Sequence, residues 1–173
     1  MKINYFLLFL LLYITTLFAQ EKPDVFDIAR KGTLAQAKAA FNNNPKAFFT
    51  INKDGYSPLI LACYRGNTEV AQFLIENGSD INGSSSMGTP LMAAVFKGNL
   101  EIVKLLLANN ANINMADGNG TTALIYAVQF QNKTVLSLLL ENKADKTHKS
   151  KEGKTAFEYA VFAGNDEIIN LLK

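Results

Sequence analysis

Apolar residues recur along most of the chain at the three- and four-residue spacing of helices that bury one face. Within residues 52–82, Ala62 and Cys63 belong to a stripe that ends at Gly66, and Val70 begins a second stripe of larger side chains. Glycine readily takes the positive φ that ends a helix, so Gly66 separates two helices. The pattern predicts an antiparallel helix pair, with a polar turn before it and a glycine-containing turn after it.

This helix-pair pattern returns three more times, at a step of about 33 residues. A triplet of Ser or Thr, Pro or Ala, and a large apolar residue marks the start of each first helix: Ser57-Pro58-Leu59, Thr89-Pro90-Leu91, Thr122-Ala123-Leu124 and Thr155-Ala156-Phe157. A second marker follows between the two helices in the same register: Gly66-Asn67, Gly98-Asn99, Gln131-Asn132 and Gly164-Asn165. Two independent markers with one period indicate a repeat protein.

A unit of this length, with a Thr-Pro-Leu helix start and a leucine-rich second helix, resembles the ankyrin repeat. The resemblance covers Asp24 to Lys173. It implies an all-α solenoid with a β-turn and an antiparallel helix pair in each unit, and about five units including degenerate terminal caps. The units are expected at about 23–51, 52–82, 83–115, 116–149 and 150–173. The chain departs from the family after the helix-start triplet, where the usual histidine is replaced by Ile60, Met92, Ile125 and Glu158.

Two early units depart from the repeat. The first unit lacks the helix-start triplet, and its Phe48, Phe49 and Ile51 are expected to return apolar groups to the core. The unit that begins at Gly83 is one residue short near 84–88. Its turn is therefore expected to differ locally from the turns of the other units.

Two later units depart in other ways. Gln131 replaces the glycine between the helices of its unit, and Lys143 replaces the glycine that ends the second helix. Each replacement costs about 1 kcal/mol where the backbone still needs positive φ. The last unit carries further polar residues that are consistent with a closing cap, because a terminal repeat has solvent on one side: Glu158, Asn165, Asp166, Glu167 and Asn170.

The first segment, Met1 to Ala19, predicts export from the cytoplasm. One lysine precedes an apolar run that ends in Leu-Phe-Ala, which is the pattern of a secretory signal peptide cleaved after Ala19. The mature domain is then 20–173, located in a bacterial periplasm or secreted. The alternative is an N-terminal membrane anchor, because the apolar run is close to the shortest length that spans a bilayer.

Composition argues against catalysis and against nucleic acid as a partner. The formal net charge is only +2, which is small for a protein that binds nucleic acid through its overall charge. Cys63 and His148 are the only residues of their kinds, so no intramolecular disulfide and no cysteine zinc site can form. The two residues lie about 85 positions apart on units that are not expected to be stacked neighbours, which makes a Cys/His nucleophile pair implausible. We expect Cys63 to be a buried hydrophobe and His148 a solvated turn residue. The sequence predicts no catalytic residues, metal ligands, cofactor or small-molecule substrate.

The resemblance to ankyrin repeats implies a binding module that uses its concave face. In that family, the residues that vary with the partner are the turn tips and the two residues before the glycine between the helices. In this chain those positions form a basic and aromatic stripe, with these candidate partner-binding residues: Arg30, Lys31, Lys53, Tyr56, Tyr64, Arg65, Phe96, Lys97, Phe130 and Phe162. Arginine and aromatic side chains are favoured in binding hot spots. The expected partner is therefore another protein with an apolar patch beside acidic groups.

A second interpretation of the same stripe is that its aromatic residues only pack against neighbouring first helices. If the stripe instead binds a partner, the sequence favours an exported, non-catalytic protein-binding module that acts as a monomer. A narrower alternative is a periplasmic inhibitor or immunity-type protein that blocks a toxin or enzyme. Another alternative is a membrane-anchored structural module of the envelope, held by an uncleaved first segment.

Overall fold

The computed structural model describes residues 24–86 and 88–173, so the predicted signal peptide of residues 1–19 lies outside the described residues. In these two ranges the chain forms ten α-helices and one 3₁₀ helix, and no strand beyond two isolated β-bridges. The helices are α2 (Val25–Lys31), α3 (Leu34–Asn43), η1 (Pro45–Phe49), α4 (Pro58–Arg65), α5 (Thr68–Glu76), α6 (Pro90–Phe96), α7 (Leu100–Ala108), α8 (Ala123–Gln129), α9 (Lys133–Glu141), α10 (Ala156–Ala163) and α11 (Asp166–Leu172). Among the described residues, no helix has the length and apolar character needed to cross a membrane.

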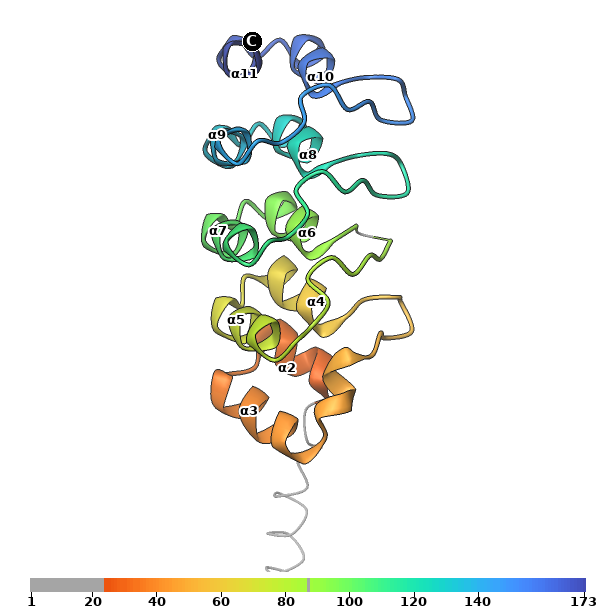
Figure 1. Cartoon of the computed structure of the whole chain (residues 1–173), viewed down its shortest axis with the longest axis vertical. Helices are drawn as coiled ribbons and strands as arrows, with labels where there is room; N and C mark the ends of the chain where they lie inside the picture. The colour runs from red at the N-terminus through yellow and green to blue at the C-terminus, as the bar shows by residue number, and fades with distance from the viewer. Residues whose placement is uncertain (1–23, 87) are drawn as a thin grey trace, which may run out of the picture.

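The helices stack as antiparallel pairs along one long axis (Figure 1). We call α2, α4, α6, α8 and α10 the inner helices, and α3, α5, α7, α9 and α11 the outer helices. Turns project from the side of the inner helices, one beside each of the later pairs (Figure 1). The prediction of an all-α solenoid of about five helix pairs is therefore confirmed.

Capping by Ser or Thr explains where the inner helices of the repeating units begin. The side-chain oxygen of Ser57 accepts a hydrogen bond from the backbone N–H of Ile60 at 3.2 Å. Thr89, Thr122 and Thr155 make the same contact at 3.3, 3.4 and 3.3 Å. Proline occupies the first helical position of α4 and α6, where its missing N–H loses no hydrogen bond. The helix-start triplet thus sets the register of each pair.

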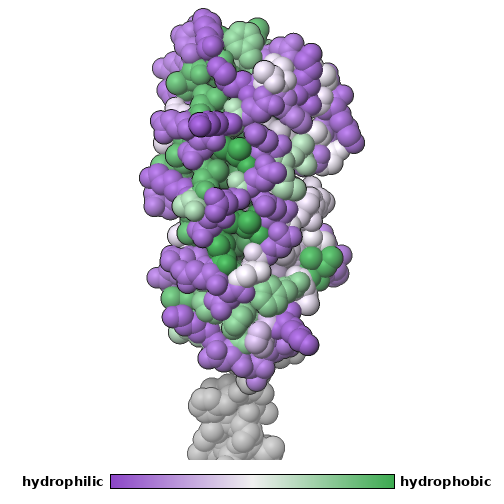
Figure 2. Space-filling model, in the orientation of Figure 1, coloured by the Kyte–Doolittle hydropathy of each residue, from purple (hydrophilic) through white to green (hydrophobic). Residues whose placement is uncertain are grey.

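The core runs through the whole stack as one cluster of buried apolar side chains. Small residues such as Ala62 and Ala94 let the inner helices approach each other, while Leu74, Leu106 and Leu139 fill the space beneath the outer helices. Cys63 is fully buried, as predicted, and burial raises the pKa of its thiol. Figure 2 shows the edge of this core as a column of apolar residues between more hydrophilic flanks.

The three apolar residues at the family's histidine position also belong to this core. Ile60, Met92 and Ile125 are each buried, and they follow one another along α4, α6 and α8. In the last unit Glu158 instead accepts a hydrogen bond from the backbone N–H of Thr155 at 2.7 Å. Burial of apolar side chains therefore replaces the histidine's polar contact in three of these units.

Asparagine side chains connect successive units. Asn67 donates from Nδ2 to the backbone oxygen of Gly32 at 2.9 Å, which lies in the preceding unit. On the side of the outer helices, Asn82 accepts a hydrogen bond from the backbone N–H of Asn112 at 2.8 Å. Asn114 accepts one from the N–H of Asp145 at 2.9 Å. These bonds satisfy backbone groups between units that the helices leave without partners.

The expected burial of Phe49 and Ile51 is wrong, because both side chains are exposed. Phe48 is buried, and it lies in the 3₁₀ helix Pro45–Phe49 that sequence analysis did not anticipate. A 3₁₀ helix has three residues per turn. Successive side chains therefore point in different directions, and only Phe48 of these three faces the core.

The shortened turn differs from the others as predicted. In the unit 52–82 the turn closes with a hydrogen bond from the N–H of Asn52 to the oxygen of Tyr56, four residues later. In the next unit the corresponding bond runs from Ser85 to Gly88, only three residues later. One fewer residue therefore lies within this turn.

His148 is not the solvated turn residue that the sequence predicts. It is partly buried, and its Nε2 lies 2.9 Å from the backbone oxygen of Gly120 in the preceding turn. The backbone N–H of Lys151 also donates to the oxygen of Asn119 at 2.9 Å. The stacking of neighbouring turns brings a distant carbonyl to the imidazole, which local sequence does not reveal.

Gln131 and Lys143 both adopt the positive φ expected of the glycines that they replace, with φ values of 53° and 64°. Replacing Lys143 with glycine is expected to raise the free energy of unfolding by about 1 kcal/mol, because glycine carries no steric cost in this conformation. Chemical denaturation measures the change. The matched control is Gly78→Lys at the equivalent position, where φ is 86° and no other residue in the described part of the chain crowds an added Cβ. It should lower the stability by a similar amount, and no change in either variant would contradict the argument.

Candidate partner-binding surface

The predicted stripe lies where the inner helices end. Tyr64 and Arg65 form the last turn of α4, Phe96 ends α6, and Phe130 directly follows α8. A residue with positive φ follows within two positions of each of them and ends the helix: Gly66, Gly98 and Gln131. Tyr64 and Phe96 lie two residues before the glycine between the helices, and Phe130 lies one residue before Gln131, which replaces that glycine. The stacked inner helices therefore bring two adjacent register positions together along one side.

Three aromatic rings of the stripe contact one another in sequence. The ring centroids of Tyr64 and Phe96 are 5.8 Å apart and the rings are stacked, with an interplanar angle of 28°. Phe96 and Phe130 meet edge to face at 4.7 Å. Tyr126 of α8 stacks on Phe130 at 6.1 Å. We call these four residues the aromatic ladder, and its Phe96 and Phe130 remain 42% and 47% exposed.

Tyr126 was not among the predicted site residues, although its spacing offered a signal. Tyr159 lies 33 residues later at the equivalent position of the next unit. The hydroxyl of Tyr126 donates to Asp117 Oδ2 at 2.8 Å, which joins α8 to its turn. Burial, together with this hydrogen bond and the negative charge of Asp117, raises the pKa of Tyr126 to about 12. The phenol stays neutral near pH 7 and the ring is held in place.

Two cations border the first part of the aromatic ladder. The Nζ atom of Lys97 lies 5.1 Å from the centroid of the Tyr64 ring, within cation–π distance. Arg65 is exposed, and neither cation forms an ion pair with another described residue. Tyr64, Arg65 and Lys97 line a shallow hollow together with Asn99. Arg65 and Lys97 are thus available to acidic groups from outside the chain.

The remaining basic residues of the stripe differ in their surroundings. Arg30 pairs with Asp27 at 3.1 Å on its own helix, so its charge is partly neutralised. Lys31 and Lys53 are exposed. Tyr56 is half-buried at its turn, where its hydroxyl oxygen accepts a hydrogen bond from Ser86 Oγ at 3.2 Å. These residues lie in the first units, beyond the ring contacts of the aromatic ladder.

Phe162 is separate from the aromatic ladder. Its side chain is 86% exposed, and it makes none of the ring pairs found among the described residues. Its neighbour is Lys154, whose Nζ lies 5.5 Å from the Phe162 centroid and 5.6 Å from that of Tyr159. The structure therefore brings Tyr64, Phe96 and Phe130 together but leaves Phe162 with the last turn.

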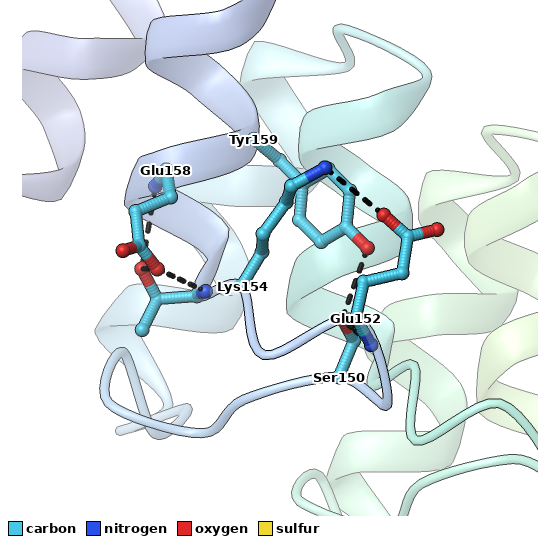
Figure 3. A network of polar contacts seen from close by, with 6 residues as sticks. Ser150, Glu152, Lys154, Glu158 and Tyr159 are labelled. Atoms are coloured by element: carbon cyan, nitrogen blue, oxygen red, sulfur yellow. Dashed lines mark hydrogen bonds and ion pairs between the residues drawn. The ribbon is translucent and has the colours of Figure 1, made fainter.

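A polar network orders this last turn (Figure 3). Lys154 Nζ donates to Glu152 Oε2 at 3.0 Å, and Ser150 Oγ lies 3.0 Å from the hydroxyl of Tyr159. The hydrogen bond and the charge attraction between Lys154 and Glu152 raise the pKa of the ammonium and lower that of the carboxyl. Both groups are therefore charged near pH 7, and the ammonium lies beside the exposed ring of Phe162.

Metal-binding geometry is not found in the part of the chain that the structure describes, since no three His, Cys, Asp or Glu residues come close enough to hold an ion. The aromatic ladder and its cations offer apolar area and positive charge. Nothing in this arrangement shows enzymatic activity.

Stacked helix pairs with a repeated exposed position define a repeat-protein scaffold. A family model described as ankyrin repeats (3 copies) matches residues 25–117 and 91–173, and the chain belongs to the ankyrin-repeat family. The chain is 31% identical over 68 residues to the ankyrin repeat and SAM domain-containing protein 6 of Rattus norvegicus. That match covers 39% of this chain and only 8% of the relative. Ankyrin repeats are generally non-catalytic modules for protein–protein interaction.

Proposed function

We propose that this chain is an exported, non-catalytic module that binds another protein through its concave face. The observation that carries the proposal is the aromatic ladder, which leaves two phenylalanines nearly half exposed beside Arg65 and Lys97. Aromatic and arginine side chains bury a large area with few torsions, and hot spots favour them. The mutual packing of the rings also lowers the entropy that they would lose on binding.

The proposed partner carries an apolar patch beside acidic groups. The apolar patch covers Phe96 and Phe130, and the acidic groups approach Arg65 and Lys97. Both cations lack an ion-pair partner among the described residues, so they retain their full charge for a binding partner. Complementary charge at the rim mainly raises the association rate and selects the partner.

A double charge reversal, Arg65→Glu with Lys97→Glu, is expected to weaken partner binding by at least tenfold, because it converts attraction to repulsion at two rim positions. Affinity capture from the envelope fraction of the host, with the chain from Gln20 as bait, supplies the partner for the measurement. Titration calorimetry then compares the affinities of the parent and the variant.

The matched control for this variant is Lys38→Glu with Lys46→Glu. These lysines are exposed in α3 and η1, outside the stripe, and their reversal changes the net charge by the same amount. The control should bind like the parent at moderate salt. Equal affinity of all three proteins would exclude Arg65 and Lys97 from the binding surface, and equal weakening by both pairs would indicate overall charge instead.

The export part of the proposal rests on the pattern of Met1 to Ala19. Full-length chain expressed in its host should yield a soluble envelope or secreted protein that begins at Gln20. N-terminal sequencing after fractionation tests this. An intact chain in the membrane fraction would favour the anchored alternative.

A further inference from the structure

The segments that follow the outer helices are joined by asparagine side chains at the later interfaces. Asn82 Oδ1 accepts a hydrogen bond from the backbone N–H of Asn112 at 2.8 Å, and Asn114 Oδ1 accepts one from the N–H of Asp145 at 2.9 Å. An asparagine also ends each outer helix of these units. Counted from it, the acceptor always comes five residues later and the donor three residues later. One register therefore supplies the bond at both interfaces.

The first interface lacks this bond. Asn44 ends α3 as Asn77 ends α5, so the same count places Phe49 at the acceptor position and Asp80 at the donor position. A phenyl ring thus stands where the later units have an amide acceptor. The backbone N–H of Asp80 makes no hydrogen bond with the rest of the described chain. A donor that is paired in the two following units is therefore unpaired here.

A hollow of about 530 Å³ lies at this interface, which is within the usual volume range of ligand pockets. Asp80 lines the hollow together with Phe48, Phe49 and Ile51. Phe49 and Ile51 are 50% and 68% exposed, so two large apolar side chains face solvent beside the unpaired donor. Apolar area and a few polar groups in one hollow are the usual composition of a binding pocket.

A second unpaired polar group belongs to the same hollow. Ser79 lines it, and the Oγ atom of Ser79 is buried without a hydrogen-bond partner among the described residues. The equivalent residues of the later units are Ala111 and Ala144, which carry no polar side-chain atom. Because an unpaired buried hydroxyl costs folding free energy, Ser79 and Phe49 both depart from the repeat without adding a contact within the chain.

We infer that this hollow binds an extended segment of another protein that carries an asparagine and a large apolar residue two positions apart. The asparagine oxygen accepts from the N–H of Asp80, as Asn82 and Asn114 accept from the donors of the following units. The apolar side chain packs on Phe49 and Ile51. Residues two positions apart in an extended segment project to the same face, so one segment makes both contacts.

The charge of Asp80 favours a neutral amide over an acidic side chain. Its Oδ1 accepts a hydrogen bond from the N–H of Asn82 at 3.0 Å. Asp80 forms no ion pair with another described residue. An aspartate of the partner would bring a like charge to this carboxylate, whereas the NH₂ group of an asparagine can donate to it.

This hollow is separate from the aromatic ladder. It meets α4 at Ser57 and Ile60, where the helix begins, whereas the ladder starts at Tyr64 in the last turn. The partner proposed for the ladder supplies acidic groups, and the segment inferred here supplies a neutral amide. The inference therefore goes beyond the proposed function.

NMR titration of the isotope-labelled chain from Gln20 with the peptide acetyl-Ser-Asn-Ser-Leu-Ser-amide tests the inference. The amide signal of Asp80 is expected to shift together with those of Phe49 and Ile51, with a dissociation constant of about 1 mM or lower. A peptide with alanine in place of the asparagine should bind at least about fivefold more weakly, because the N–H of Asp80 then lacks its acceptor. A peptide with aspartate at that position should also bind more weakly than the parent peptide.

Phe49→Asn restores the asparagine of the later units. Its side chain should accept from the N–H of Asp80, so the peptide should bind at least about tenfold more weakly. Because Phe49 is half exposed, the circular dichroism spectrum should not change. The matched control is Phe49→Leu, which keeps an apolar side chain without an acceptor and should bind the peptide within about threefold of the parent. Equal binding by these two variants would overturn the inference.

The same titration reveals any other occupant of the hollow. No local shift at Asp80 up to about 10 mM peptide, ten times the expected constant, would leave the hollow to solvent. A shift of that signal on dilution without peptide would assign the hollow to a second copy, and a shift on Gln20→Ala would assign it to the residues before Asp24. Loss of peptide binding in Phe96→Glu with Phe130→Glu would move the site to the aromatic ladder. Each of these results overturns the inference.

Discussion

Replacing Leu106 with alanine is expected to lower the free energy of unfolding by about 2 to 5 kcal/mol. Leu106 lies in the middle of α7 and is fully buried between the units before and after it. The substitution removes apolar burial and leaves a cavity, because the helices on both sides are held by their own contacts and relax only in part. In a stacked array, this loss weakens two interfaces as well as the unit itself.

Urea denaturation followed by circular dichroism measures this loss. Lys104→Ala in the same helix is the control, because Lys104 is exposed and its ion pair with Glu101 lies on the surface. That control should change the stability by less than about 1 kcal/mol. A Leu106→Ala variant as stable as this control would mean that α7 does not pack as the structure shows.

Gly66→Ala is expected to destabilise the chain by about 2 kcal/mol or more, the second-largest effect. Gly66 has a φ of 78°, which costs an alanine about 1 to 2 kcal/mol. A Cβ atom here would also lie 2.6 Å from Nδ2 of Asn99, which belongs to the next unit. The side chain of Asn99 must then move, and its contact between units is disturbed.

Gly78→Ala separates the two causes. Gly78 has a similar φ of 86°, but among the described residues no atom beyond its chain neighbours lies within 4 Å of where an added Cβ would be. This control carries the backbone strain alone and should cost about 1 to 2 kcal/mol, the same strain as at Gly66. The difference between the two variants, measured by thermal and urea denaturation, reports the contact with Asn99. Equal losses would show that Asn99 adapts freely.

The repeat markers explain why the fold was predictable from sequence. The helix-start triplet and the Gly-Asn marker act through local geometry, namely capping, proline at the first helical position and positive φ. The candidate stripe was predictable in part, because Tyr64 and Phe96 share one register position. Tyr126 was missed, since it joins the aromatic ladder only by stacking on Phe130 across one helical turn.

The sequence by itself determined the period, the helix pairs, the shortened turn and the positive φ of Gln131 and Lys143, because each depends on residues close along the chain. Only the tertiary structure decided which apolar groups face solvent and which side chains meet across units. It exposed Phe49 and Ile51, joined His148 to Gly120, and left Phe157 and Val161 uncovered. Burial at any position depends on the neighbouring unit, and local periodicity carries no information about whether a neighbour is present.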